Sequence, residues 1–210
     1  IENKCDRLLT AGTEIIGSTA GAAIGLLGGP ICSLAGAASG PIIIKILKRV
    51  CAEFSDRQIG TRQRIRAGAT AAVAIDRIKN RLDSGDKIRG DGFFKKGSRS
   101  SAEEIFEGVL IKSHNEHEEK KAEFYANIFV TAAFDSRFSC ESLNHFLSLG
   151  ARLTYRQLCL LQFFRSSIRN GLSDEEYDWN YLKFISFERM AILHETYDLY
   201  QLRLLKCQSP

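Results

Sequence analysis

The sequence predicts an all-α protein in which a glycine-rich, apolar N-terminal helical hairpin precedes a C-terminal helical bundle. Seventeen glycines but only three prolines occur in 210 residues, and the glycines are concentrated, which favours helices over a many-turned β-sandwich. Residues 15–44 contain no charged side chain. Most of the remaining chain has the apolar spacing of amphipathic helices. We therefore divide the chain into a membrane-associated glycine-zipper segment (1–50), a basic helical region with a loop (51–99) and a C-terminal helical domain (100–210).

The composition excludes several classes of protein. Hydrophobic residues make up 44% of the chain and charged residues 26%, with a mean hydropathy of −0.14, so neither a disordered chain nor a polytopic membrane protein is expected. Six scattered cysteines without a CxxC pair indicate reduced thiols rather than a zinc module. His114, His117 and Glu118 have a ligand-like spacing, which we interpret as a solvated helix face. We predict no metal, no cofactor and no soluble metabolic enzyme, since phosphate-loop and nucleophile motifs are missing from the sequence.

The uncharged stretch is long enough to meet a membrane. A straight helix over residues 15–44 would span about 45 Å, more than the roughly 30 Å of bilayer hydrocarbon. Gly28, Gly29 and Pro30 lie near its middle, and these residues favour two shorter helices hinged at about residue 29. A helix half-buried in a soluble protein would have a polar face, which this stretch lacks. Its alternative interpretation is a buried hairpin in a soluble core.

Small residues recur at every fourth position of this stretch, in a GxxxGxxxGxxxG pattern. Four residues advance about 400° around a helix, so the glycines form one ridge on which a second helix can approach closely. Glycine costs roughly 1 kcal/mol against alanine in a helix interior, a cost that close packing must offset. We therefore predict a homo-oligomer with these glycines at its contacts or lining a pore. The predicted positions are Gly17, Gly21, Gly25, Gly29, Gly36 and Gly40.

A dense basic block follows the uncharged stretch. Residues 1–44 carry a net charge of −1, residues 45–99 a net charge of +9 and residues 100–210 a net charge of −4. The positive-inside rule places such a block on the cytoplasmic flank, among anionic headgroups. A solvated arginine-rich helix face and a nucleic-acid surface are the alternatives. The candidate membrane-surface or phosphate-binding residues are Lys45, Lys48, Arg49, Arg62, Arg64 and Arg66.

Further helices are expected along the rest of the chain. Residues 62–82 have one apolar and one basic face, and the Gly-, Asp- and Lys-rich residues 83–99 predict a loop. Ser100 and Glu103 have the spacing of a capping box, from which we expect one long helix to about Phe134. Three shorter helices are expected to begin after Ser139, Thr154 and Ser186.

Part of the C-terminal half resembles a known family. The string KKAEFYANIFVTAAFDSRFSCESLNHFLSLGARLTYRQLCLLQFF, residues 120–164, resembles the bacterial abortive-infection family Abi-alpha, in which this segment follows a Gly/Ala-rich apolar region. The shared motifs are hydrophobic patterns rather than catalytic residues. The resemblance implies a phage-defence protein that acts at the bacterial inner membrane. The extended basic block departs from the family pattern.

A second resemblance concerns Arg189 and His194, which form an R-x4-H motif in the string RMAILH. This motif is similar to that of HEPN ribonucleases, in which two subunits bring paired arginines and histidines together to cleave RNA. Met190 departs from that pattern, because a polar residue usually follows the arginine. Some small membrane accessories of RNA-guided defence systems carry a HEPN-like motif without evident nuclease activity. The motif therefore does not exclude a membrane role.

These patterns predict an oligomeric, membrane-associated antiphage defence effector or accessory, which permeabilises or depolarises the inner membrane by forming a pore and is not an enzyme. Its expected partners are copies of itself, membrane lipids and a protein of the defence system. The basic and C-terminal regions are expected on the cytoplasmic side. The alternative is a HEPN-type ribonuclease or RNA-binding accessory whose hydrophobic hairpin is an oligomerisation core.

Overall fold

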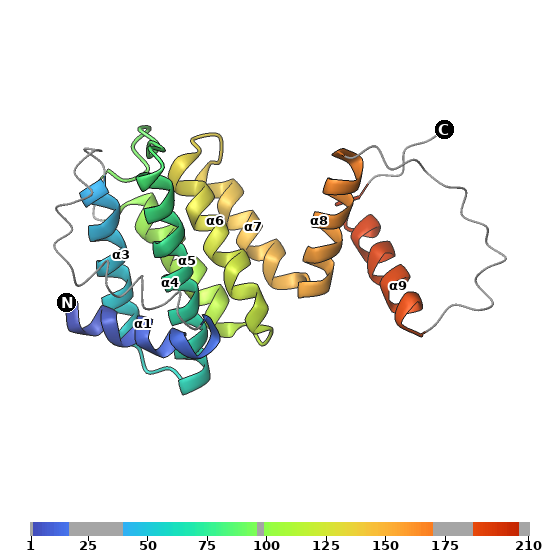
Figure 1. The fold of residues 1–210 in the computed structure, drawn as a ribbon, viewed down its shortest axis with the longest axis horizontal. Coiled ribbons are helices and arrows are strands. Elements are labelled where there is room, and N and C mark those ends of the chain that lie inside the picture. The colour runs from blue at the N-terminus through green and yellow to red at the C-terminus, as the bar shows by residue number, and fades with distance from the viewer. Residues whose placement is uncertain (1, 17–39, 96–98, 170–186, 206–210) are drawn as a thin grey trace. The chain divides into compact units, whose positions relative to one another are not determined.

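The computed structural model describes residues 2–16, 40–95, 99–169 and 187–205. Within these ranges the chain is all-α, with eight α-helices, one short 3₁₀ turn and no strand (Figure 1). This confirms the predicted all-α class. The contacts divide the chain into two units, residues 1–152 and 153–210. The domain boundaries predicted at residues 50 and 99 both fall inside the first unit.

Among its described residues, the first unit has six α-helices and the 3₁₀ turn. Helix α4 runs through it and packs against α1, α5 and α6, while α3 packs against α1 and α5, and α7 against α5 and α6. Short loops join most of these helices, as is typical of helical bundles. Their bounds are α1 Glu2–Ile16, α3 Gly40–Ser55, α4 Thr61–Asp83, α5 Ser101–Asn115, η2 Glu119–Lys121, α6 Ala122–Phe134 and α7 Cys140–Arg152.

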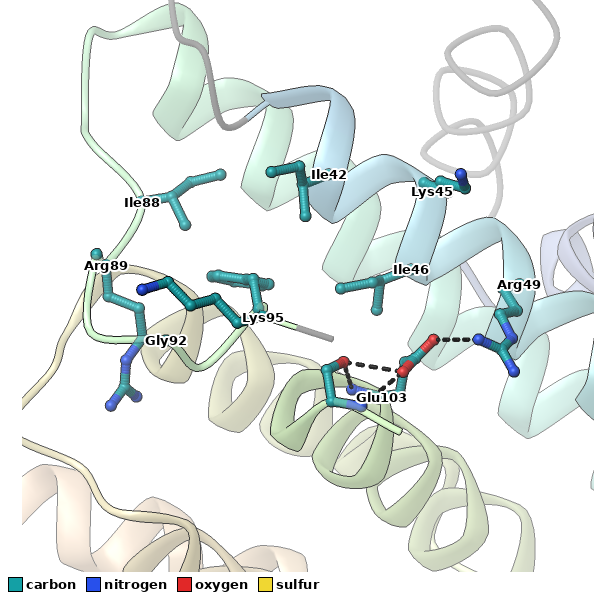
Figure 2. A pocket seen from close by; sticks show the side chains of 12 residues that line it. Ile42, Lys45, Ile46, Arg49, Ile88, Arg89, Gly92, Lys95 and Glu103 are labelled. Atoms are coloured by element: carbon teal, nitrogen blue, oxygen red, sulfur yellow. Dashed lines mark hydrogen bonds and ion pairs between the residues drawn. The ribbon is translucent and has the colours of Figure 1, made fainter. Parts of the chain in front are cut away.

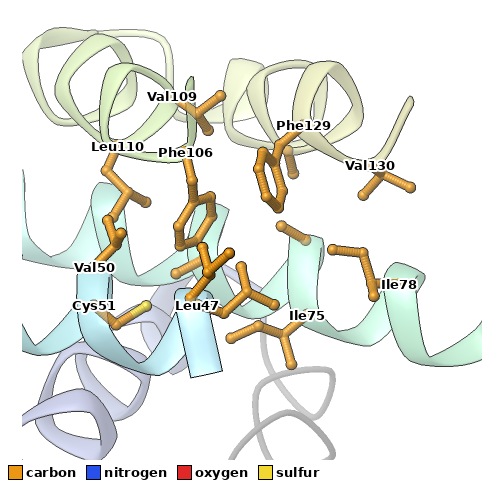
Figure 3. Packing of buried hydrophobic residues seen from close by; sticks show 14 of the residues in the cluster. Leu47, Val50, Cys51, Ile75, Ile78, Phe106, Val109, Leu110, Phe129 and Val130 are labelled. Atoms are coloured by element: carbon orange, nitrogen blue, oxygen red, sulfur yellow. The ribbon is translucent and has the colours of Figure 1, made fainter. Parts of the chain in front are cut away.

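The core of this unit combines a small-residue helix with aromatic neighbours. Helix α4 buries an alanine-rich face together with Ile75 and Ile78. Opposite it, the rings of Phe106 on α5 and Phe129 on α6 lie with their centroids 4.7 Å apart, and Leu47 of α3 joins the same cluster (Figure 3). The small alanine side chains of α4 let neighbouring helices approach closely, and the large rings of α5 and α6 fill the space that remains between the helices. The cluster draws residues from all three segments that the sequence analysis separated.

Helices α1 and α4 meet through glycines. A Cβ atom added at Gly68 would lie 2.0 Å from the carbonyl oxygen of Leu8, and one added at Gly12 would lie 2.3 Å from the amide nitrogen of Ala69. Both distances are far below any real Cβ contact, so the two backbones touch. This contact places Leu8 and Leu9 of α1 at 0% exposure in the core. Helix α1 is therefore an integral part of the first unit, whose packed helices α1 and α3–α7 we call the body.

Several helix starts follow from their capping residues. Ser100 Oγ accepts a hydrogen bond from the Glu103 backbone N–H at 3.2 Å, and the Ser100 backbone N–H donates to Glu103 Oε2 at 2.7 Å, which confirms the predicted capping box at the start of α5. The hydroxyl of Ser139 accepts from the Ser142 N–H at the start of α7. Residues 84–95 form a loop after α4, as predicted.

The single long helix predicted from Ser100 to about Phe134 is wrong. Helix α5 ends at Asn115, and α6 begins only at Ala122, after the 3₁₀ turn. The polar residues between them let the chain reverse, so that α5 and α6 pack side by side. The break is stabilised by Lys121, a fully buried lysine that pairs with Glu116. A straight helix would have carried the aromatic residues of α6 away from the core.

The second unit contains α8 (Tyr155–Arg169) and α9 (Phe187–Gln201). Thr154 Oγ1 accepts from the Gln157 N–H at 3.1 Å, which confirms the predicted start of α8. Arg156 of α8 donates to both carboxylate oxygens of Glu195 on α9, at 2.6 and 2.8 Å. Few side chains in the described part of this unit are buried, and several large apolar ones are exposed. The exposed ones are Phe163, Phe187, Met190, Ile192, Leu193, Tyr197 and Tyr200.

The two ends of the uncharged stretch belong to the body of the first unit. Helix α1 continues to Ile16, and α3 begins at Gly40, so that Ile43 and Ile44 are buried in the core. The hairpin hinge predicted near residue 29 lies outside the described residues. Within the described ranges, every helix is too short or too polar to serve as a membrane span.

Candidate functional site

Helix α3 has two different faces directly after the uncharged stretch. Ile43 and Leu47 lie on its inner face, which is fully buried. Ile42, Lys45 and Arg49 recur at spacings of three and four residues, so they share the outer face. Ile42 is 48% exposed although it is large and apolar, and Lys45 is also exposed. The outer face thus combines an exposed apolar side chain with basic groups.

A groove of about 760 Å³ opens beside this outer face, at the start of α3. Its walls come from α3, from the loop between α4 and α5 and from the first turn of α5 (Figure 2). Ile42 and Ile46 of α3 face Ile88 of the loop across the groove (Figure 2), and Phe94 adds a ring to the same lining. The groove therefore has a mainly apolar wall.

Two arginines in the lining are already paired. Arg49 donates to Glu103 Oε1 at 3.0 Å and to Glu53 Oε1 at 2.9 Å. The side chain of Arg89 is only 5% exposed and binds Asp91, and its guanidinium also donates to the carbonyl oxygens of Ala132 and Phe138 at 3.1 and 3.0 Å. The guanidinium of Arg89 points away from the groove (Figure 2). These arginines hold the walls of the groove in place.

The carboxylate of Glu103 at the base of the groove stays ionised. Burial raises its pKa, but hydrogen bonds from the Ser100 backbone and hydroxyl and the charges of Arg49 and Arg99 together lower the pKa below its ordinary value. The hydrogen bond from Arg89 likewise lowers the pKa of Asp91, against the effect of burial. Each of these carboxylates is thus matched by an arginine at the groove.

The other two cations of the lining, Lys45 and Lys95, are exposed. Among the described residues, neither lysine forms an ion pair with a carboxylate. Lys45 lies on α3, and Lys95 lies in the loop between α4 and α5. The groove therefore carries two lysine charges at its rim that the described part of the protein does not neutralise.

The six predicted basic residues fall into two groups on different helices. Lys45, Lys48 and Arg49 lie on α3, whereas the other three lie in the first turns of α4. There Arg62 pairs with Glu14 of α1 and Glu119 of η2. The other members of the α4 group are Arg64 and Arg66, whose Nε atoms are buried and lack a hydrogen-bond partner within the described ranges. Arg62 thus ties α4 to α1 and η2, and Lys45 and Arg49 of the α3 group line the groove.

The predicted glycine ladder lies almost entirely outside the described residues. Gly40 is the first residue of α3, and this is where the described chain resumes after the uncharged stretch. The remaining predicted positions, Gly17, Gly21, Gly25, Gly29 and Gly36, fall within residues 17–39. Their role at a contact or pore stays a prediction.

Arg189 and His194 lie on the exposed surface of α9. The two residues are five positions apart on one helix, which places them about 140° apart around its axis. The imidazole Nδ1 of His194 lies 3.6 Å from the Asp198 carboxylate, and its side chain is 79% exposed. One copy of the chain therefore does not bring Arg189 and His194 together.

The histidines near residue 115 do not form the solvated helix face that the sequence predicts. His114 packs its ring against Phe54, with centroids 5.5 Å apart, and burial together with the charge of Arg66 lowers its pKa. His117 lies in the break after α5, with atoms of Glu116 and Glu118 near it. The Glu116 carboxylate forms a buried ion pair with Lys121. The predicted face is wrong because the helix ends before His117.

Sequence reasoning missed the groove itself. Its lining is collected from positions 42–49, 88–95 and 100–103, which are distant in the sequence, and a pattern on one segment does not predict such a site. The available signal was Ile42, an isoleucine beside a lysine on the outer face of an otherwise regular amphipathic helix. In comparisons with protein-family models, curated proteins and solved structures, no match to this chain was found.

Proposed function

We propose that this chain is a membrane-associated protein of bacterial antiphage defence, which self-assembles and permeabilises the inner membrane through its uncharged segment. The observation that carries the proposal is the run of thirty residues, 15–44, without a charged side chain, joined at both ends to packed helices. The defence role rests on the resemblance of residues 120–164 to the Abi-alpha family. The basic region and the C-terminal region then lie on the cytoplasmic side.

The packing of α3 refines which residues are available to the membrane. Ile43 and Ile44 are committed to the core of the body, and α1 includes Ile16. The uncharged residues between the two helices are therefore 17–39. A straight helix of that length would span about 35 Å, against roughly 30 Å of hydrocarbon. The shorter segment is still long enough for the proposed insertion.

Self-assembly is supported by two features of the chain. The small residues at every fourth position of 17–39 suit close contacts between helices in lipid. The second unit exposes large apolar side chains, including Phe187 at 90% and Phe163 at 58%, and side chains of this kind mark interaction surfaces when they gather. Copies of the chain, or a protein of the same defence system, are the partners we propose for this unit.

The basic outer face of α3 supports contact with anionic headgroups. It begins within a few residues of the uncharged segment, and a lysine or arginine near an anionic bilayer surface contributes about 1 kcal/mol of attraction. Assembly of uncharged helices would open a path for ions, and a path across the inner membrane dissipates its potential. No covalent chemistry is needed for this action, so the proposal requires neither a catalytic residue nor a cofactor.

Fractionation and leakage measurements test the proposal. We expect the protein in the membrane fraction and expect it to release dye from vesicles. Gly21→Leu combined with Gly25→Leu should abolish leakage and assembly, because both substitutions fill the ridge. Ala22→Leu combined with Ala23→Leu is the matched control, since it adds apolar volume off the ridge and should retain both properties. Full leakage by the ridge variant would refute the pore.

The ribonuclease alternative predicts a different outcome. Recovery of the protein entirely in the soluble fraction, with RNA cleavage that Arg189→Ala or His194→Ala abolishes, would replace the membrane proposal. The HEPN arrangement would then require two copies of α9, because Arg189 and His194 diverge on a single helix. RNA-binding without cleavage would leave the basic residues of α4 as the phosphate contacts.

A further inference from the structure

We propose that the groove at the start of α3 binds the headgroup of an anionic phospholipid, with the adjoining part of the lipid against its apolar wall. This inference rests on the proposed membrane association and names the lipid chemistry that the body would recognise. It concerns residues 42–49, 88–95 and 100–103, and it does not depend on the structure of the uncharged segment.

The size and lining of the groove suit an amphiphilic ligand. Small-molecule sites commonly enclose about 300–1,000 Å³ and are lined mainly by apolar side chains with a few polar groups. The groove has about 760 Å³, and Ile42, Ile46, Ile88 and Phe94 provide its apolar wall. Ile42 remains 48% exposed. A lipid glycerol and the start of an acyl chain would cover this side chain and remove it from water.

The charges of the groove specify an anion. Four of the lining residues are cations, and Glu103 is the carboxylate among them. Arg49 pairs with Glu103 at 3.0 Å, and Arg89 pairs with Asp91 at 2.5 Å, so these charges are balanced inside the protein. Lys45 and Lys95 are left at the rim without a carboxylate partner in the described part of the chain. The two lysines lie on different sides of the groove (Figure 2), and a phosphate group beside the Lys95 ammonium, with Lys45 adding positive charge nearby, would supply negative charge that the described residues lack.

The ligand is a lipid rather than a free phosphate because of where the apolar wall lies. A free phosphate would be held by the lysines alone and would leave Ile42 exposed to water. The groove also lies at the first turns of α3, immediately after residue 39, where the uncharged segment ends. If that segment enters the bilayer, the start of α3 lies at the depth of the headgroups. A lipid headgroup is then the anion at the highest local concentration.

Calorimetric titration of the full-length protein in a neutral detergent tests this site. The probes are a short-chain phosphatidylglycerol, a short-chain phosphatidylcholine and glycerol phosphate alone. We expect saturable binding of phosphatidylglycerol and much weaker binding of the other two probes. Lys45→Gln combined with Lys95→Gln should weaken phosphatidylglycerol binding roughly 30-fold, given about a fivefold loss for each lysine near an anionic surface.

Two further variants separate a built site from general surface charge. Lys79→Gln combined with Lys87→Gln removes the same charge from outside the groove and should leave the affinity within about twofold of the unmodified protein. Ile42→Gln keeps every charge and should weaken phosphatidylglycerol binding about fivefold, because it removes apolar contact with the lipid. Both substituted lysine pairs lie at exposed or half-exposed positions, so folding should be retained, and circular dichroism checks this.

The outcomes distinguish this inference from the proposed function. Three results would each overturn the lipid site. The first is an equal loss of phosphatidylglycerol binding in the Lys45/Lys95 and Lys79/Lys87 variants. The others are equal affinity for glycerol phosphate and phosphatidylglycerol, and unchanged binding by Ile42→Gln. None of these results concerns leakage through the uncharged segment. Conversely, a protein that binds phosphatidylglycerol through the groove but shows no leakage would keep the site and refute permeabilisation.

Discussion

Gly68→Ala should loosen the first helix from the body. The new methyl group would lie 2.0 Å from the carbonyl oxygen of Leu8, whereas a carbon approaches a carbonyl oxygen to about 3.3 Å. The helices must therefore separate by more than about 1 Å, because the opposing atom is backbone and has no alternative rotamer. Overpacking of this kind costs about 1–3 kcal/mol, and we take the upper value. The better helix propensity of alanine returns about 1 kcal/mol.

The expected net effect is a loss of about 2 kcal/mol in the free energy of unfolding. Urea denaturation followed by far-ultraviolet circular dichroism measures it. Gly108→Ala is the matched control, since its new methyl group would meet only the side-chain atom Leu147 Cδ1 at 3.1 Å, and a leucine side chain can shift. We expect a change below about 1 kcal/mol for this control. A Gly68→Ala protein as stable as the unmodified chain would refute the backbone contact between α1 and α4.

Three other predictions concern the core, its pH dependence and the second unit. Lys121→Met should cost about 3–5 kcal/mol in urea unfolding, because it leaves the buried Glu116 carboxylate without its cation, and adding Glu116→Gln should recover part of the loss. The folded pKa of Glu116 is lowered, since hydrogen bonds and charge from Lys121 outweigh burial, as is that of Glu103. Stability from both groups should therefore be complete above about pH 5 and fall as the pH drops through their folded pKa values, and a flat urea midpoint between about pH 5 and about pH 3 would contradict this. Phe187→Ser, at a side chain that is 90% exposed, should lower the assembled fraction in analytical ultracentrifugation without changing helicity, whereas unchanged assembly would exclude this part of α9 from the contact.

The secondary structure was largely predictable because its signals are local. Ser100 and Thr154 each lie directly before a helix and accept the expected hydrogen bond from a backbone N–H. The break between α5 and α6 was not predictable in the same way. The strongly charged residues 114–121 are compatible with an exposed helix, and the reversal is stabilised by tertiary contacts such as the buried pairing of Lys121 with Glu116. Tertiary contact decided the local conformation here.

The close contact between α1 and α4 was also missed, although its residues are of the type the sequence analysis considered. Glycines were interpreted as a contact surface only where they recur at every fourth position. Gly12 and Gly68 contribute one glycine each, 56 positions apart in the sequence, so no periodicity reveals them. The alanine-rich surroundings of Gly68 were the available signal, because a helix face of small residues favours a close neighbour. The groove was missed for the related reason that three distant segments form it.

The packing of α1 and α3 restricts how the uncharged segment can meet a bilayer. Both helices belong to one body, since α1 packs on α4 and on α3. A single crossing by residues 17–39 would place Ile16 and Gly40 on opposite sides of the membrane, which that body does not allow. An entry and return from one side would keep the body intact, but an arm of about twelve residues would span only about 18 Å as a helix, about 60% of the roughly 30 Å of hydrocarbon. If the segment meets a bilayer while the body keeps this fold, it can reach into one leaflet only, and a complete crossing would require α1 to leave α4. The Gly12–Gly68 contact is the part of the protein that opposes this release, so Gly68→Ala should increase leakage under the membrane proposal while lowering the stability of the body.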